Sequence, residues 1–111
     1  MIRGSVYRID LGDAKRGHEQ AGKRLGICLS EDPGNWSTTT VIPTSTRASI
    51  AIFRPRLLID GRETVALVDQ IRSIDTRWVV GDPVDHLRHV DMAEVEYALS
   101  RWLRLSLNLG Y

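Results

Sequence analysis

The sequence contains one cysteine, Cys28, and no run of more than four consecutive apolar residues. A single cysteine excludes an intramolecular disulfide framework and any zinc site built from cysteines. The short apolar runs exclude a membrane-spanning helix, and no apolar segment of the kind found in secretory signals follows the first residues. We therefore expect a cytoplasmic protein with no membrane partner.

Lysine is also scarce. The chain has 15 basic and 14 acidic residues, but only Lys15 and Lys23 are lysines. A GC-rich coding sequence enriches arginine, so the distribution of the basic residues is more informative than their number. No acidic residue occurs from 33 to 59, a stretch that holds three arginines, and a second basic stretch runs from 15 to 24. Because the arginine fork pairs with phosphate in two places, these zones predict a local anion-binding groove.

The length of 111 residues fits a single domain, 1–111, and no internal repeat or linker divides it. Short segments rich in valine, isoleucine and threonine alternate with turn residues through the first 80 positions, which predicts a small barrel or curled sheet. The expected strands are Ser5–Asp10, Gly26–Ser30, Thr38–Thr44, Phe53–Ile59, Val65–Val68 and Thr76–Val80.

Local signals predict the connections between these elements. Asp60-Gly61 is a hairpin turn signal, with a loop that extends to Glu63 as an alternative. A short helical turn is expected to begin at Pro83, which is favoured as the first residue of a helix. Leu11 to Lys23 form a glycine-punctuated loop of 13 residues, which is either a binding element or a surface crossing.

The C-terminal region shows the period of a helix. Asp91 followed by Glu94 resembles a capping box, and Asn108 and Gly110 are expected stop residues. The apolar stripe is formed by Met92, Val95, Leu99, Trp102 and Leu103. We expect Trp102 to lie in the core of the domain.

Four segments, taken in order, resemble the MazF/PemK/Kid-type toxin family. The opening strand 3–11 and the segment 17–24, GHEQAGKR, match its first strand and the loop pattern G-x-E-Q-x-G-x-R. The segment 41–46, VIPTST, matches V-x-P-x-[ST]-[ST], and 67–74, LVDQIRSI, matches D-Q-[IV]-[RK]-[ST]-I. The resemblance covers nearly the whole chain. Two positions depart from it, since Leu25 replaces a proline and Ser5 an acidic residue.

The resemblance implies a fold and an activity. The fold is mainly β, a small SH3-like barrel of the CcdB/Kid/MazF kind with a C-terminal helix. The activity is that of a type II toxin–antitoxin toxin, an endoribonuclease that cuts single-stranded RNA, chiefly mRNA, at short motifs with neither metal nor cofactor. Its partners are a second copy of the chain and a cognate antitoxin, which covers the RNA groove with a flexible segment.

The resemblance also assigns residues. Arg24 matches the catalytic arginine, which stabilises the phosphorane charge first and transfers a proton second. Ser45 matches the catalytic hydroxyl, although Thr44 and Thr46 are neighbouring alternatives. The residues expected to contact RNA are Glu19, Gln20, Lys23, Thr44, Thr46 and Arg72. Asp69-Gln70 is expected to form a structural polar network.

Rival interpretations stay open at this stage. His18, beside Glu19, offers an acid–base mechanism, with His86 and His89 as weaker candidates on the surface of a helical segment. The same fold also serves CcdB-like gyrase poisons, which do not catalyse, and a plain RNA-binding module is a third possibility. The aspartates and glutamates show no recognisable metal-ligand spacing, so no metal site is predicted.

Overall fold

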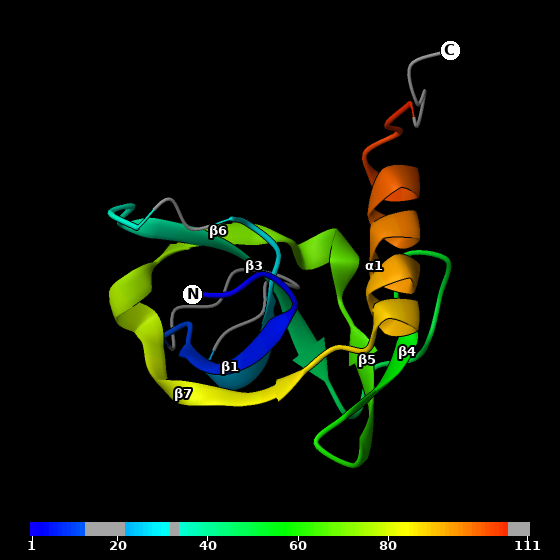
Figure 1. The fold of residues 1–111 in the computed structure, drawn as a ribbon. Coiled ribbons are helices and arrows are strands. Elements are labelled where there is room, and N and C mark those ends of the chain that lie inside the picture. The colour runs from blue at the N-terminus through cyan, green and yellow to red at the C-terminus, as the bar shows by residue number, and fades with distance from the viewer. Residues whose placement is uncertain (13–21, 32–33, 107–111) are drawn as a thin grey trace.

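A computed structural model describes residues 1–12, 22–31 and 34–106 of the chain (Figure 1). Its elements are β1 (Ser5–Asp10), β2 (Lys23–Cys28), β3 (Thr38–Ser45), β4 (Arg56–Ile59), β5 (Arg62–Ala66), η1 (Val68–Gln70), β6 (Arg72–Asp75), η2 (Thr76–Trp78), β7 (Val79–His86) and α1 (His89–Trp102).

The strands form one antiparallel sheet in the order β4-β5-β3-β2-β1-β7, and β6 also pairs with β3. Figure 1 shows this sheet curling on itself, with β7 and β6 at opposite sides of the ring and α1 beside the β4–β5 hairpin. The predicted mainly β, barrel-like fold with a C-terminal helix is therefore confirmed.

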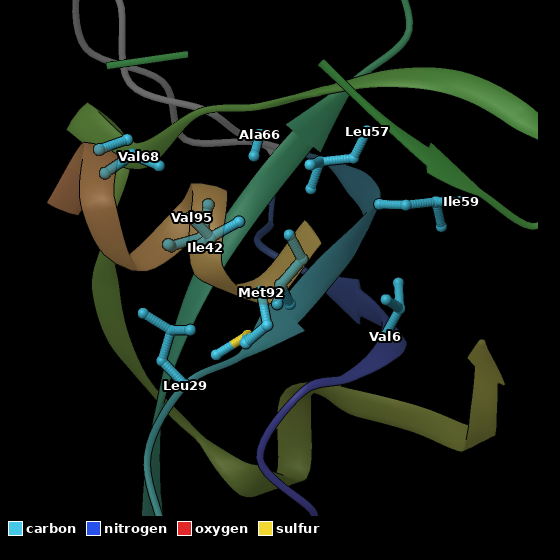
Figure 2. Packing of buried hydrophobic residues seen from close by; sticks show 11 residues of the cluster. Val6, Leu29, Ile42, Leu57, Ile59, Ala66, Val68, Met92 and Val95 are labelled. Carbon is cyan, nitrogen blue, oxygen red and sulfur yellow. The ribbon is translucent and has the colours of Figure 1, made fainter. Parts of the chain in front are cut away.

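Two hydrophobic clusters lie on opposite faces of the central strands. In β1, Val6 belongs to one cluster and Ile9 to the other, as expected when side chains alternate along a strand. The first cluster holds the helix against the sheet: Met92 and Val95 pack with Ile42 and residues of the hairpin (Figure 2). The second cluster fills the curl of the sheet. Both clusters hold β1, β2 and β3 in place.

The predicted hairpin turn is confirmed as the shortest type. Ile59 pairs with Arg62, so the loop consists of Asp60 and Gly61 alone, with φ of 51° and 76°. Positive φ at both central residues matches the twist of a two-residue hairpin, and aspartate and glycine tolerate it. Because β5 pairs with β3 only at Thr44 and Ser45, the tip of this hairpin extends past the end of β3.

The prediction of a strand over Thr76–Val80 is wrong in part. Thr76–Trp78 form a 3-10 turn, in which the Arg77 amide donates a hydrogen bond to the Asp75 carboxylate at 2.8 Å. The strand preceding it, β6, was not predicted, because four residues are too few for a clear alternation. The bounds of β2, β4 and β5 also differ by two or three residues from the prediction.

The helical turn expected at Pro83 is wrong, because Pro83 lies inside β7. Among the described strands β7 pairs only with β1, and its register shifts between Val6 and Arg8. Gly81 there has a φ of 75°. Proline, which lacks an N–H, is tolerated on such an interrupted edge strand.

The bounds of α1 differ at both ends from those that the sequence predicts. The helix begins at His89, with Arg88 as N-cap, so Asp91 lies in the first turn and accepts hydrogen bonds from the Arg88 guanidinium. The predicted stop residues Asn108 and Gly110 lie outside the described residues. The helix ends at Trp102, and Arg104 then adopts a φ of 54°.

The end of α1 is a Schellman motif. The Leu105 amide donates to the Ser100 carbonyl at 2.8 Å, and the Arg104 amide donates to that of Arg101 at 3.3 Å. Trp102 is 43% exposed and packs edge-on against Phe53, with 5.1 Å between ring centroids. The expectation that Trp102 lies in the core is therefore wrong: Trp102 is the last residue of α1, and its side chain lies at the protein surface against Phe53.

Candidate RNA-binding groove

A groove of about 320 Å³ opens where β2 begins, β3 ends and the β4–β5 hairpin reaches across. It is lined by Arg8, Lys23, Arg24, Leu25, Thr44, Ser45, Thr46, Ile59, Asp60, Arg62 and Thr64. Four of these side chains are cationic and one, Asp60, is acidic. The charge therefore suits a polyanion, as the basic zones of the sequence predict.

Antiparallel pairing brings Arg24 and Ser45 together. Gly26 of β2 pairs with Pro43 of β3, and continuing that register by two residues sets Arg24 opposite Ser45. The Arg24 guanidinium reaches the same strand end, where its Nη1 donates to the Thr44 carbonyl at 3.4 Å. Two residues that are 21 positions apart in the sequence thus line one groove.

The Ser45 hydroxyl has a defined polarity. Its Oγ accepts hydrogen bonds from the amides of Arg47 and Ala48, both at 3.1 Å. A hydroxyl has two lone pairs and one proton. Because both lone pairs are engaged by the backbone, the O–H is left to donate. Ser45 is therefore built to donate to an oxyanion and not to accept a proton.

The two threonines beside Ser45 differ in their surroundings. Thr44 is buried, and its hydroxyl donates to the Leu25 carbonyl at 2.8 Å, which ties β3 to β2. Thr46 is exposed and lines the groove. The Thr44 hydroxyl therefore has a structural partner, whereas Ser45 and Thr46 present theirs at the surface of the groove.

Of the other residues predicted to contact RNA, some line the groove and some do not. Lys23 is exposed and lines the groove. Arg72 does not line it: its guanidinium carbon lies 5.8 Å from the centre of the Trp78 ring, and its strand β6 pairs with residues 38–41 of β3, at the opposite end of β3 from the hairpin. Glu19, Gln20 and His18 lie outside the described residues.

The remaining histidines do not line the groove either. His86 ends β7 and its Nδ1 shares a 2.7 Å hydrogen bond with the Ser5 hydroxyl, while His89 is the first residue of α1. The expectation that both belong to one helical segment is therefore wrong for His86. The hydrogen bond occupies the buried hydroxyl at Ser5, one of the two departures from the family pattern.

Sequence reasoning missed Arg8 and Arg62. Arg8 interrupts the apolar residues of β1, and Arg62 follows the hairpin turn. An exposed arginine within an otherwise buried strand is a signal that could have marked Arg8. Arg62 carried no such signal, because only the fold brings the hairpin over the end of β3.

A mostly shielded ion pair fixes the segment that follows Ser45. Arg54 donates from Nε and Nη2 to the two carboxylate oxygens of Asp69, at 2.8 and 2.7 Å. This bidentate bond holds the pKa of Asp69 below its ordinary value of 3.8 and raises the pKa of Arg54. The pair links residues 46–55 to η1 and so supports the loop whose amides hold Ser45. Asp69 is thus structural, as predicted.

We expect Asp69→Asn to lower the free energy of unfolding at pH 7 by about 1–3 kcal/mol, because it breaks the bidentate pair. The folded chain binds the Asp69 proton more weakly than the unfolded chain does, so the pair contributes fully above about pH 4 and is lost as the pH falls through the lowered pKa. Urea unfolding from pH 7 to 2.5 should show the difference between wild type and variant shrinking below pH 4.

The exposed pair of Asp75 and Arg77 supplies the control. Asp75→Asn removes a similar bond at the surface and should change stability much less, because exposed ion pairs contribute little. A difference between wild type and Asp69→Asn that stays constant over the whole pH range would contradict the structural role given to the pair.

Two further observations concern ions and membranes. Across residues 1–12, 22–31 and 34–106, no group of three or more histidine, cysteine, aspartate or glutamate side chains is placed to hold a metal ion. Within the same ranges no helix has the length and apolar character needed to span a membrane.

Comparisons with known proteins agree on one family. Residues 2–103 match the profile of a family described as PemK-like, MazF-like toxins of type II toxin–antitoxin systems. The chain is 54% identical over 105 residues to a candidate toxin of Mycobacterium tuberculosis H37Rv, covering 95% of this chain and 99% of the relative. Endoribonuclease EndoA of Bacillus subtilis 168 is 34% identical over 111 residues, with 93% and 94% covered.

Solved structures share the fold. MazF from Deinococcus radiodurans superposes with a TM-score of 0.76 at 27% identity, covering 93% of this chain and 96% of that one. A mycobacterial endoribonuclease in complex with its cognate antitoxin gives a TM-score of 0.77 at 19% identity, covering 96% and 97%.

Proposed function

Since the chain belongs to the family of PemK-like, MazF-like toxins of type II toxin–antitoxin systems, we propose that it is an endoribonuclease that cuts single-stranded RNA, chiefly mRNA, at specific short motifs. The placement of Arg24 and Ser45 in one cationic groove is the observation that carries this proposal. The similarity to an endoribonuclease of Bacillus subtilis supports it.

The proposed reaction uses the nucleophile that RNA itself carries. The ribose 2′-oxygen attacks the adjacent phosphorus, the bond from phosphorus to the 5′-oxygen breaks, and the products end in a 2′,3′-cyclic phosphate and a 5′-hydroxyl. The 2′-proton leaves to solvent or a nearby base, and the departing 5′-oxygen takes a proton. Neither metal nor cofactor takes part in this scheme.

In this scheme Arg24 and Ser45 stabilise the negative charge that develops on the phosphorane. A guanidinium stays protonated at neutral pH, so Arg24 acts first as a fixed positive charge with two parallel donors. Ser45 adds one O–H donor, since its lone pairs are held by the backbone. Donors held in place before the reaction usually supply the largest share of such a rate enhancement.

Incubation of the purified protein with a defined single-stranded RNA in EDTA tests the proposal. We expect cleavage at discrete sites, cyclic-phosphate and 5′-hydroxyl ends, and no cut where a single 2′-deoxynucleotide replaces the nucleotide 5′ of the site. RNA that stays intact while DNA gyrase supercoiling is inhibited would overturn the proposal in favour of a gyrase poison.

The partners belong to the same proposal. A cognate antitoxin inhibits the chain by laying a flexible segment over the groove, and two copies of the chain form a homodimer. An antitoxin complex among the structural neighbours supports a cognate antitoxin as a partner. Light scattering that finds only a 12.5 kDa species at micromolar concentration would contradict the dimer.

A further inference from the structure

A second cavity, of about 610 Å³, adjoins the groove on the side of β1 and β7. It is lined by Arg8, Ile9, Asp10, Lys23, Arg24, Leu25 and Val80. Arg8, Lys23, Arg24 and Leu25 line both hollows and so stand between them. A ligand held at Arg24 can therefore continue from the groove into this cavity without leaving the cationic surface.

The sheet register arranges three side chains of this cavity in a row. Arg8 of β1 pairs with Leu25 of β2 on one side and with Val80 of β7 on the other. Paired residues in a sheet point to the same face, so one guanidinium is flanked by two apolar side chains. Val80 is 54% exposed and Leu25 is half-buried. We call this set, Leu25, Arg8 and Val80, the β1 row.

Within the described part of the chain, the guanidinium of Arg8 forms no ion pair. The exposed arginines Arg3, Arg77 and Arg88 each form an ion pair there, whereas the structure records none for Arg8. The nearby carboxylate of Asp10 already accepts a hydrogen bond from the Gly12 amide at 3.0 Å. The β1 row therefore presents a cation that is available to an anionic ligand, beside apolar surface.

We propose that the β1 row is a nucleotide-binding subsite for RNA. Arg8 binds a phosphate next to the one held by Arg24 and Ser45, and the flat face of the base packs on the apolar side chains of Leu25 and Val80. Arg8 and Arg24 both line the groove and the adjoining cavity, so a strand whose scissile phosphate lies at Arg24 can bring its next phosphate to Arg8. This inference rests on the proposed function and extends its substrate-binding surface.

RNA suits this surface better than a second copy of the chain does. A symmetric contact between two β1 rows would bring the cations of both copies together, because a two-fold interface uses the same patch twice. A single-stranded nucleic acid instead supplies the phosphate for Arg8 and an unstacked base for the apolar flanks.

The test combines a protein change with a change of single phosphates. The probe is a short RNA with a 2′-deoxynucleotide at the cut site, so that it binds and is not cleaved, and its affinity is read by fluorescence anisotropy. In companion probes each phosphate in turn is replaced by an uncharged methylphosphonate. Wild type, Arg8→Ala and Arg77→Ala are compared at several salt concentrations.

We expect Arg8→Ala to weaken binding about 10-fold or more, the loss typical of a hydrogen bond to a charged group. The slope of log affinity against log salt should fall by about 0.7, the value for one phosphate contact on a single strand. A methylphosphonate at one of the two phosphates that flank the cut site should weaken binding by wild type and leave binding by Arg8→Ala unchanged.

Arg77→Ala is the matched control, because it removes the same charge from an exposed position paired with Asp75. It should bind all probes as wild type does. To test the apolar flank, Val80→Ser is compared on probes with and without the base at that nucleotide; removing the base should weaken binding several-fold in wild type and less in the variant.

Wild-type affinity of Arg8→Ala, or equal sensitivity of both proteins to every methylphosphonate, would overturn this inference. Its failure is distinguishable from failure of the proposed function. If wild type binds RNA and never cleaves an unmodified strand, the ribonuclease proposal fails while the dependence on Arg8 is still measured. If wild type cleaves RNA and Arg8→Ala behaves as wild type, only the subsite is wrong.

Discussion

Replacing Arg24 by alanine is expected to slow RNA cleavage by about 10²–10³-fold under single-turnover conditions, the effect of removing one fixed donor from an oxyanion site. The Arg24 guanidinium lies at the strand end that carries Ser45, where it donates to the carbonyl of the preceding residue, Thr44. The loss should appear mainly in the rate constant, because Arg8, Lys23 and Arg62 continue to attract the RNA.

Arg24→Lys should recover only part of the rate, because lysine keeps the charge and loses the two parallel donors. Thermal unfolding of both variants should stay close to that of wild type, since Arg24 lines the groove and lies outside both hydrophobic clusters. If Arg24→Ala cleaved normally while His18→Ala were inactive, a histidine mechanism would replace the one proposed here.

Replacing Ser45 by alanine is expected to lower the cleavage rate by about 10–10²-fold, the cost of one hydrogen bond to a charged group. Affinity for an uncleavable RNA should change little, because the hydroxyl matters most when charge develops on the phosphorane. Single-turnover rates and anisotropy titrations separate the two quantities.

Ser45 also has a structural role that the experiment has to separate. Alanine leaves the amides of Arg47 and Ala48 without their acceptor, so the variant should unfold at a lower temperature. Ser45→Thr keeps a hydroxyl on the same carbon and should restore both the rate and the stability. A threonine variant that regained stability without regaining the rate would contradict the role of the hydroxyl as a donor.

Much of the fold could be predicted from the sequence. The strand Ser5–Asp10 has the predicted bounds, and the two-residue turn at Asp60-Gly61 is the one that its residues favour. Such elements depend on local backbone preferences and on the alternation of side chains, both of which are visible in a short window of sequence.

The features that were missed depend on distant contacts or on uncommon residues. Pro83 looks like the start of a helix and lies in an edge strand, because pairing with β1 decides its conformation. The helix ends at a Schellman motif in which Arg104 takes the place that glycine usually fills, so the sequence shows no stop signal just after Trp102.

The residues of the candidate site also fall into those that the sequence predicts and those that only the fold reveals. Arg24, Ser45, Thr46 and Lys23 could be named from their motifs, and the structure gathers them in one groove. Arg8 and Arg62 could not, because their place in the groove follows from the sheet register and from the reach of the hairpin. Arg72 matches its motif yet lies against Trp78, so its contact with RNA stays a prediction.

If Arg24 and Ser45 act together on one phosphate, the single-turnover cleavage rate of the double variant Arg24→Ala/Ser45→Ala should reveal it. Residues that act as a unit show strongly non-additive losses. We therefore predict that the double variant cleaves about as slowly as Arg24→Ala alone. A double variant whose loss equals the product of the two single losses would show that the two side chains work independently and would contradict the account.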